Sequence, residues 1–419
     1  MQEINAMNRK IMRILICLFI LSSLTSCFSY RDMNHVIFYT MGVFDENDEQ
    51  FLFYGEGFKA FRAEGEKAGT EKRLALFGEG SSLTVAVGVM RNSVNYPIDY
   101  AGNKSNVFTK KIAEHGIEDV LDIVHRDQKP SLRVYMFVYD GTGSDLINFE
   151  IEDEPFMGLY LYEMMNSQKT TMDVIASQYY EFIEKQNTGS GINVLPLISK
   201  RTIEEMAHLG TQEGQGSDQN KGSEKKGSDK SSEGNSDSKG NEGSVLTKPY
   251  ILFDGAAVFV KSKMVAQLER CEVEVYKLLT SKVTSGLVNT ENPDFPDSDV
   301  GFTVLKNKFK SKVALKDGRI QLDYNLTLKV VLLEAEKGIG SDAETLTKLK
   351  LNLEDTIKQR TTDFFEKMKR KKIDILDIKR KLELAHLDPE TDDIMGMTDF
   401  NVKVNVIIDG TGKLKDSYY

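Results

Sequence analysis

The clearest pattern of apolar and polar residues lies in the C-terminal half of the chain. Apolar residues recur at every second position from Ile320 to Leu332 and again from Phe400 to Ile408. A period of two residues predicts β-strands that bury one face. The turn sequence Lys-Asp-Gly-Arg at 316–319 predicts a hairpin that joins the first of these strands to a strand over 308–315.

A different period separates these strands. Between residues 342 and 371 the apolar positions recur with the spacing of an α-helix. The inward face of this predicted helix consists of Leu346, Leu349, Leu353, Ile357 and Phe364. An antiparallel sheet packed on one long helix is therefore the fold predicted for the C-terminal half, which places it in the α+β class.

Shorter elements alternate in the N-terminal half. Apolar runs and helical spacing predict strands over 36–43, 51–58 and 132–139 and helices over 83–90 and 171–184. The clearest helix contains Ile117, Val120, Leu121 and Val124, which share one face. The polar residues 45–48 predict a hairpin turn between the first two strands. Strands and helices mixed in this way predict a second α+β part.

One long segment has no apolar side chain. From Gly210 to Ser244 the chain contains only Gly, Thr, Gln, Glu, Ser, Asp, Asn and Lys. Such a composition cannot bury enough apolar surface to offset the entropy of ordering. We therefore expect a disordered linker over 208–246, between an N-terminal domain at 27–207 and a C-terminal domain at 247–419.

The N-terminus has the pattern of a secretion signal. Arg9, Lys10 and Arg13 precede an apolar run from Ile14 to Leu24, which is too short to span a bilayer comfortably. The sequence Leu-Thr-Ser-Cys ends at Cys27 and is typical of a lipoprotein signal, in which the cysteine thiol takes a diacylglycerol and the chain is cut before it. We therefore predict a signal peptide at 1–26 and lipid attachment at Cys27. The alternative is an ordinary signal peptide or a transmembrane anchor.

Composition narrows the classes of partner. The 419 residues carry 54 Lys and Arg against 64 Asp and Glu, a formal net charge of −10, so a nucleic-acid binder is not expected. The three cysteines are Cys17, Cys27 and Cys271. Cys17 lies inside the predicted signal, so no disulfide framework is available. We expect Cys271 to be buried as a small apolar residue.

No motif in the sequence assembles a catalytic or metal site, so no cofactor is expected. The chain has no Gly-x-Ser-x-Gly elbow, which disfavours an ordinary α/β-hydrolase. No histidine is spaced from another ligand as a metal site requires, and solvated or core histidines are expected. The five histidines are His35, His115, His125, His208 and His386.

Three short motifs are interpreted most simply as turns or helix ends. Gly78-Glu79-Gly80 resembles a phosphate-binding loop but lacks its third glycine and its lysine, so a helix entry turn is favoured. The sequence Asp-Gly-Thr-Gly at 140–143 and 409–412 predicts two turns, with a paired-aspartate site as a remote alternative. The basic run 367–372 is a solvated helix end or a contact with anionic lipid or an acidic partner.

Several segments together resemble the Ger(x)C family, the C-subunit lipoproteins of spore germination receptors. They are "CFSYRDMN" at 27–34 with the following strand that ends in Met41-Gly42-Val43, residues 112–138, residues 252–279 around "GAAVF", and "IDILDI" at 373–378. Two features depart from the family: Phe28 stands where the family usually has Trp, and the linker is longer than usual.

The resemblance implies a non-enzymatic role. Proteins of this family are held by lipid on the outer face of the spore inner membrane, with a polytopic B-subunit and an A-subunit, and together they respond to nutrients such as amino acids or sugars. Direct nutrient binding by this subunit is not implied. The alternative functions are a solute-binding lipoprotein of a membrane transporter and, more remotely, a surface hydrolase.

Overall fold

The computed structural model describes residues 12–16, 35–59, 73–127, 130–151, 154–203, 205, 249–335 and 342–410. Cys27, most of the predicted signal peptide and the predicted linker lie outside these ranges. Among the described residues, no helix combines the length and apolar character needed to cross a membrane.

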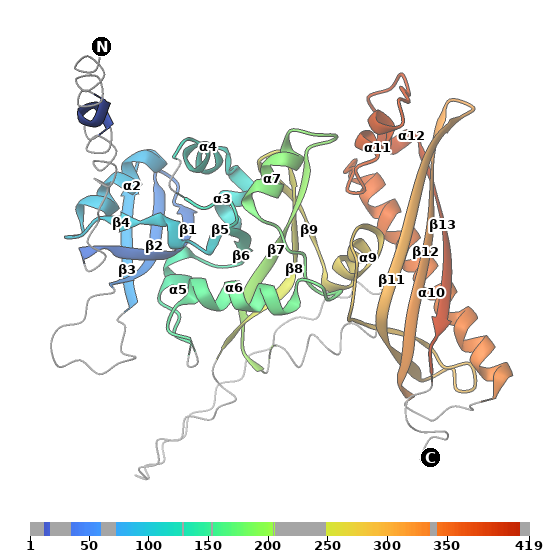
Figure 1. Cartoon of the computed structure of the whole chain (residues 1–419). Helices are drawn as coiled ribbons and strands as arrows, with labels where there is room; N and C mark the ends of the chain where they lie inside the picture. The colour runs from blue at the N-terminus through green and yellow to red at the C-terminus, as the bar shows by residue number, and fades with distance from the viewer. Residues whose placement is uncertain are drawn as a thin grey trace, which may run out of the picture.

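A nine-stranded mixed sheet forms the larger part of the molecule (Figure 1). Its order is β3-β2-β1-β5-β6-β7-β8-β9, and the short β4 also pairs with β1. The central strands β1, β5, β6 and β7 are parallel, whereas both edges are antiparallel. The strands are β1 (Ile37–Glu46), β2 (Phe51–Lys59), β3 (Arg73–Gly80), β4 (Ile98–Asp99), β5 (Ser105–Thr109), β6 (Tyr135–Tyr139), β7 (Ile192–Arg201), β8 (Tyr250–Val260) and β9 (Lys263–Leu268).

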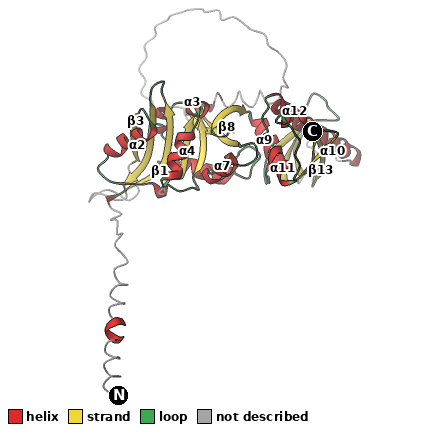
Figure 2. Ribbon diagram, turned by 90° about the horizontal axis from the view of Figure 1, so that it is seen from above, coloured by secondary structure: helices red, strands yellow, loops and turns green. Residues whose placement is uncertain are grey.

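Helices cover both faces of this sheet (Figure 2). Side chains alternate along the strands, so Met136 and Val138 of β6 face one core while Tyr135 and Phe137 face the other. One face packs on α2 (Leu83–Asn92), α3 (Lys110–His115), α4 (Glu118–Arg126) and α7 (Tyr179–Gln186), beside the 3₁₀ turn η2 (Tyr100–Gly102). The other face packs on α5 (Gly143–Ile147) and α6 (Met157–Gln168).

The predicted elements of this half are confirmed except for one helix. The hairpin of β1 and β2, the helix α2, the helix α4 and the strand β6 all form. The helix predicted over 171–184 is wrong, because it begins only at Tyr179. Gln178 and Glu181 form a capping box that fixes this start. The preceding residues are drawn into the sheet, where Met136 N donates to Ser177 O at 3.0 Å.

A second sheet of four strands lies in the C-terminal half. Its order is β10-β11-β12-β13, and the long helix α10 packs against β13 and β10. The hairpin turn is as predicted, with positive φ at Asp317 and Gly318, the signature of a tight β-hairpin. The elements are α9 (Arg270–Thr280), β10 (Leu287–Glu291), β11 (Asp299–Lys316), β12 (Arg319–Ala335), α10 (Ala343–Arg370), α11 (Ile378–Leu384), α12 (Ile394–Met397) and β13 (Thr398–Ile408).

The α+β class is confirmed, but the second sheet is not wholly antiparallel. β13 pairs with β12 in parallel, from Ile320 opposite Thr398 to Val330 opposite Ile408. The physical reason is α10, whose 28 residues span about 42 Å and return the chain to the end at which β12 began. The next strand must then run in the same direction as β12.

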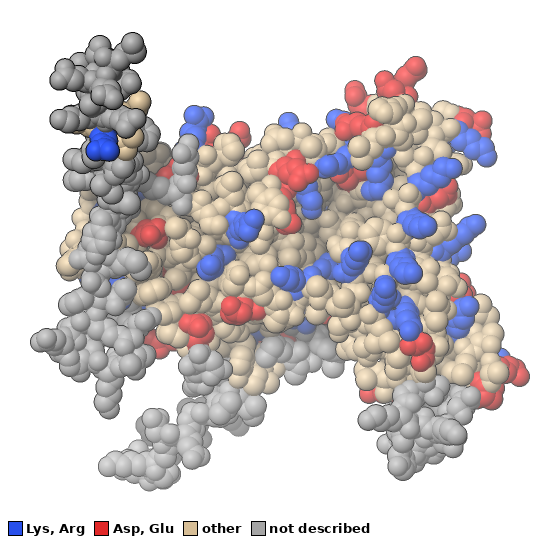
Figure 3. All heavy atoms as spheres, viewed as in Figure 1, with Lys and Arg blue, Asp and Glu red and all other residues tan. Residues whose placement is uncertain are grey.

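The first sheet is completed by strands from the far side of the predicted linker. β8 pairs with β7 over ten residues of register, from Ile192 opposite Val260 to Arg201 opposite Tyr250. The chain therefore enters the second sheet only after β9. The face shown in Figure 3 carries more Lys and Arg over the second sheet than over the first.

Candidate functional site

The predicted lipid site is close in sequence to the first strand. Cys27 lies outside the described residues, and β1 begins ten residues later at Ile37. Ten residues span at most about 35 Å when fully extended. An acyl chain on Cys27 would therefore keep the first sheet within about that distance of a membrane.

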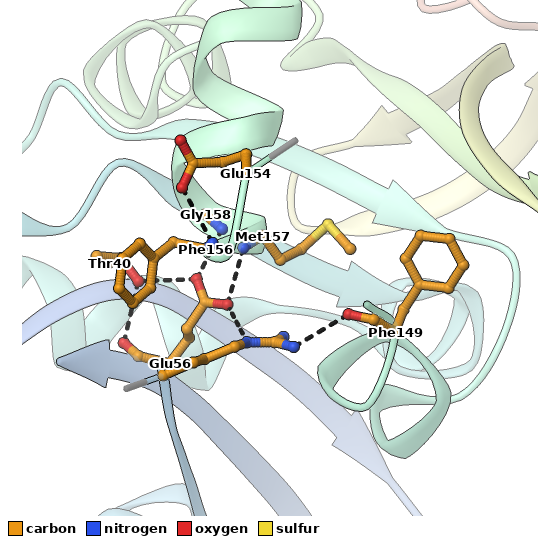
Figure 4. Close-up of polar contacts among 8 residues, drawn as sticks. Thr40, Glu56, Phe149, Glu154, Phe156, Met157 and Gly158 are labelled. Carbon is orange, nitrogen blue, oxygen red and sulfur yellow. Dashed lines mark hydrogen bonds and ion pairs between the residues drawn. The ribbon is translucent and has the colours of Figure 1, made fainter. Parts of the chain in front are cut away.

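A buried carboxylate holds the helix α6 against the first sheet (Figure 4). Glu56 of β2 is 0 % exposed. Its carboxylate accepts the backbone N–H groups of Met157 and Gly158, each at 2.8 Å. These are the first residues of α6, where N–H groups lack partners within the helix and the dipole favours an anion.

Two side chains complete the shell around Glu56. Thr40 of β1 donates its hydroxyl at 2.8 Å, and Arg73 of β3 donates Nε at 2.6 Å. Arg73 also donates Nη1 to the carbonyl of Phe149 at 3.0 Å. Gly158 is required here, because a Cβ at this position would lie 2.6 Å from the carbonyl oxygen of Thr40. Glu56 thus joins three strands and one helix.

A second carboxylate explains the first Asp-Gly-Thr-Gly sequence. Asp45 of β1 accepts the hydroxyl of Thr109 at 2.6 Å and the backbone N–H of Gly143 at 2.8 Å. The sequence at 140–143 is therefore a turn that leads into α5, as predicted. In the second copy the structure describes Asp409, which pairs with Lys329 at 2.6 Å directly after β13.

Gly78 serves helix packing. A Cβ at Gly78 would lie 2.0 Å from the carbonyl oxygen of Ala86, so α2 can approach β3 only over a glycine. Ser82 caps α2 by accepting the N–H of Val85. The helix entry turn predicted at 78–80 is confirmed.

The described histidines lie apart from one another in function. His115 contacts Glu46 at 2.8 Å, and the ring of His35 lies 5.5 Å from that of Tyr96. His125 and His386 are exposed, and His208 lies outside the described residues. Within the described ranges, no group of three or more His, Cys, Asp or Glu side chains is arranged to hold a metal ion.

A pocket of about 70 Å³ opens between the first sheet and the helices α2 and α4. This is several times the ~10–15 Å³ that one water molecule needs. Aromatic and aliphatic side chains form most of its wall, among them Tyr39, Phe44, Phe53 and Leu83. Burial raises the pKa of Tyr39 well above its ordinary value, so this phenol stays neutral.

The polar groups of the pocket lie at its two ends. Arg91 of α2 and Asp127, which follows α4, pair at 3.6 Å, and Nε of Arg91 donates to the hydroxyl of Tyr100 at 3.2 Å. Deeper in, Asn103 donates Nδ2 to Asn106 at 2.8 Å, while Oδ1 of Asn103 has no hydrogen-bond partner among the described residues. This wall is suited to hold a small, mainly apolar molecule with one hydrogen-bond donor.

Two family models match successive parts of the chain. The model described as "Spore germination protein N-terminal domain" matches residues 29–200. The model described as "Spore germination B3/ GerAC like, C-terminal" matches residues 254–412. The chain belongs to the Ger(x)C family of spore germination proteins. Together the two matches cover both sheets and all the described helices from α2 onward.

Known relatives of this Ger(x)C protein are distant in sequence. The curated protein "Spore germination protein GerQC" of Bacillus cereus is 18 % identical over 292 residues, which are 70 % of this chain and 68 % of that protein. The solved structure "Crystal Structure of the GerBC protein" is similar with a TM-score of 0.51 and 14 % identity, over 88 % of this chain and 96 % of that one. The structural likeness supports the fold.

The segment "IDILDI" of this Ger(x)C protein joins the two halves. Asp374 accepts the hydroxyl of Ser190 at 2.6 Å and the backbone N–H groups of Ile378 and Lys379 at 2.7 and 2.9 Å. Burial raises the pKa of Asp374 from its ordinary value. Arg380 adds a hydrogen bond to Thr188 at 2.9 Å.

A second contact between the halves uses a buried lysine. Lys277 of α9 is 4 % exposed and donates Nζ to the carbonyl of Lys169 at 2.9 Å, at the C-terminal end of α6. Burial lowers the pKa of Lys277 to about 8. A cation here meets the negative end of the helix dipole, which offsets part of the cost of burial.

Replacing Lys277 with Met should remove a rise in stability at alkaline pH. Between pH 8 and 10.5 the unfolded chain binds the proton at residue 277 and the folded chain does not, so the free energy of unfolding of the wild type increases with pH in this window. The full rise is about 3 kcal/mol. We expect urea denaturation at pH 7.5 and pH 10.5 to show it for the wild type and for Lys282→Met, an exposed control, but not for Lys277→Met.

Two sequence-based expectations about single positions differ from the structure or remain predictions. Cys271 is exposed on α9, so its predicted burial is wrong. The reason is its place in the first turn of the helix, where Val273 and Val275 take the inward positions. In the basic run, Lys367 pairs with Glu272 at 2.5 Å and Lys369 donates to the carbonyl of Thr398 at 2.6 Å. A contact of this run with lipid stays a prediction.

Sequence reasoning missed Glu56, Arg91 and Asp127. A glutamate between two glycines inside an apolar strand was an available signal for Glu56. Arg91 and Asp127 are 36 positions apart on different helices, and no local pattern links them.

Proposed function

We propose that this chain is a lipid-anchored, non-enzymatic subunit of a nutrient germinant receptor. The single observation that carries the proposal is the match of both family models, which extends over nearly the whole chain that follows Cys27. The lipoprotein signal ending at Cys27 supports the anchor, since two or three acyl chains hold a protein firmly on a membrane.

The role is contact with other proteins at the outer face of the spore inner membrane. The strongest buried charges described above support such a role, because they connect structural elements. Glu56 fixes α6, Asp45 fixes the turn at 140–143, and Asp374 joins the two halves. The partners are the polytopic B-subunit and the A-subunit of the same receptor.

Affinity purification tests the partners. The full acylated chain, tagged at its C-terminus, is isolated from spore membranes in a mild detergent. We expect the A- and B-subunits to copurify in constant ratio with it. A chain that copurifies instead with the permease of a transporter, and binds a nutrient tightly by itself, would support a solute-binding lipoprotein and contradict the proposal.

A further inference from the structure

The outward face of the second sheet carries a row of lysines. Lys306, Lys308, Lys310 and Lys312 occupy alternate positions of β11, and all four are exposed. Their neighbours Asn307, Phe309 and Val313 point to the opposite face, toward α9 and α10. Alternate residues of a strand are about 6.8 Å apart, so four like charges stand in line at close spacing.

The register extends this row across the sheet. Lys306 lies opposite Lys329 of β12, and Asn325 lies between Lys310 of β11 and Lys403 of β13. The face thus holds six lysines, which we call the lysine face: Lys306, Lys308, Lys310, Lys312, Lys329 and Lys403. Two acids share it, since Asp323 lies opposite Lys312 and Asp409 pairs with Lys329.

The described residues leave most of this charge uncompensated. Lys329 is the one member of the lysine face with an ion pair among them. Four net positive charges therefore remain on this face in a chain whose formal net charge is −10. Like charges on neighbouring positions repel, and an external anionic surface would relieve the repulsion.

The chemistry of the face favours a lipid surface over a folded protein. The outward positions of β12 and β13 contain Gln, Asp, Asn, Thr, Lys, Val and Ile, with no aromatic residue and no arginine. Protein interfaces are enriched in aromatic residues and Arg and depleted in Lys. Lysine acts as a mobile, hydrated point charge, which suits an array of lipid phosphates. Aliphatic side chains, Leu287 and Ile407, are exposed at the other end of the same rows.

We propose that the lysine face docks on the headgroups of an anionic lipid bilayer. The face would then be a second membrane contact, far along the chain from Cys27, and would fix the orientation of the second sheet on the bilayer. The contact is electrostatic, so it weakens as salt is raised.

The absence of tryptophan from the chain gives a direct test. Asn325→Trp places the sole tryptophan in the centre of the lysine face, and Leu351→Trp places it on the exposed side of α10 as a control. The full acylated chain is bound to vesicles of phosphatidylcholine alone or with phosphatidylglycerol. We expect a blue shift of emission for Asn325→Trp on the anionic vesicles only, which is lost at high salt, and no shift for Leu351→Trp.

Charge reversal supplies the second arm. In the Asn325→Trp background, Lys308→Glu with Lys310→Glu should abolish the shift, whereas Lys348→Glu with Lys358→Glu on α10 should leave it unchanged. Equal emission on both kinds of vesicle, with the chain bound to each, would overturn the proposal. So would a loss of germination in the Lys308→Glu, Lys310→Glu variant without any lipid effect, because it would assign the face to an acidic protein. Failure of the anchor would appear separately, as a chain that does not float with phosphatidylcholine vesicles.

Discussion

Replacing Glu56 with Gln should lower the free energy of unfolding by about 3–5 kcal/mol, the loss expected when one partner of a buried ion pair is removed. Glutamine has one acceptor oxygen, whereas the carboxylate serves four donors from Thr40, Arg73, Met157 and Gly158. The variant would leave the guanidinium of Arg73 without its anion, and the side-chain amide would face the N–H groups of α6.

Urea denaturation followed by circular dichroism measures this loss. Glu79→Gln is the matched control, because Glu79 is an exposed residue of the neighbouring strand β3, and we expect it to change stability by less than about 0.5 kcal/mol. A loss below about 1 kcal/mol for Glu56→Gln would show that Glu56 does not hold α6 on the sheet.

Replacing Cys27 with Ala should abolish lipidation and leave the signal segment attached. The prediction follows from the signal pattern ending at Cys27, because the thiol is the group that is acylated before the chain is cut. Labelling with a clickable palmitate analogue, followed by mass spectrometry of the N-terminus, measures both effects. We expect label in the wild type and in the control Cys271→Ala, and none in Cys27→Ala.

The two cysteine variants separate the anchor from general thiol chemistry. Cys271 is exposed, so it is accessible to any unspecific acylation. Equal label in Cys27→Ala and the wild type, or a Cys27→Ala chain cut at the same position, would contradict the anchor.

Regular patterns of period two or 3.6 predicted the fold well. The alternation in β12 and the inward face of α10 both appear in the structure, where Leu349, Leu353 and Ile357 are buried. These predictions succeed because one buried face imposes a period on the sequence. The helix over 171–184 failed for a related reason, since its apolar residues are buried in an irregular segment and the capping box at Gln178 sets the true start.

Features set by long-range pairing could not be read from the sequence. The parallel register of β13 depends on where α10 returns the chain, and the pairing of β8 with β7 crosses the whole predicted linker. The donors to Glu56 come from residues 16 to 102 positions away. The lysine face is intermediate, because the alternation of lysines at 306–312 is visible in the sequence but its outward direction required the sheet.

Germination itself tests the central claim most directly. In a strain whose other germinant receptors are deleted, dipicolinate release is measured with a panel of amino acids and sugars for spores lacking this chain, complemented with the wild type or with Cys27→Ala. We predict that the response to one nutrient class requires the chain and is restored by the wild type but not by Cys27→Ala. Full release in spores that lack the chain would contradict its role as a receptor subunit.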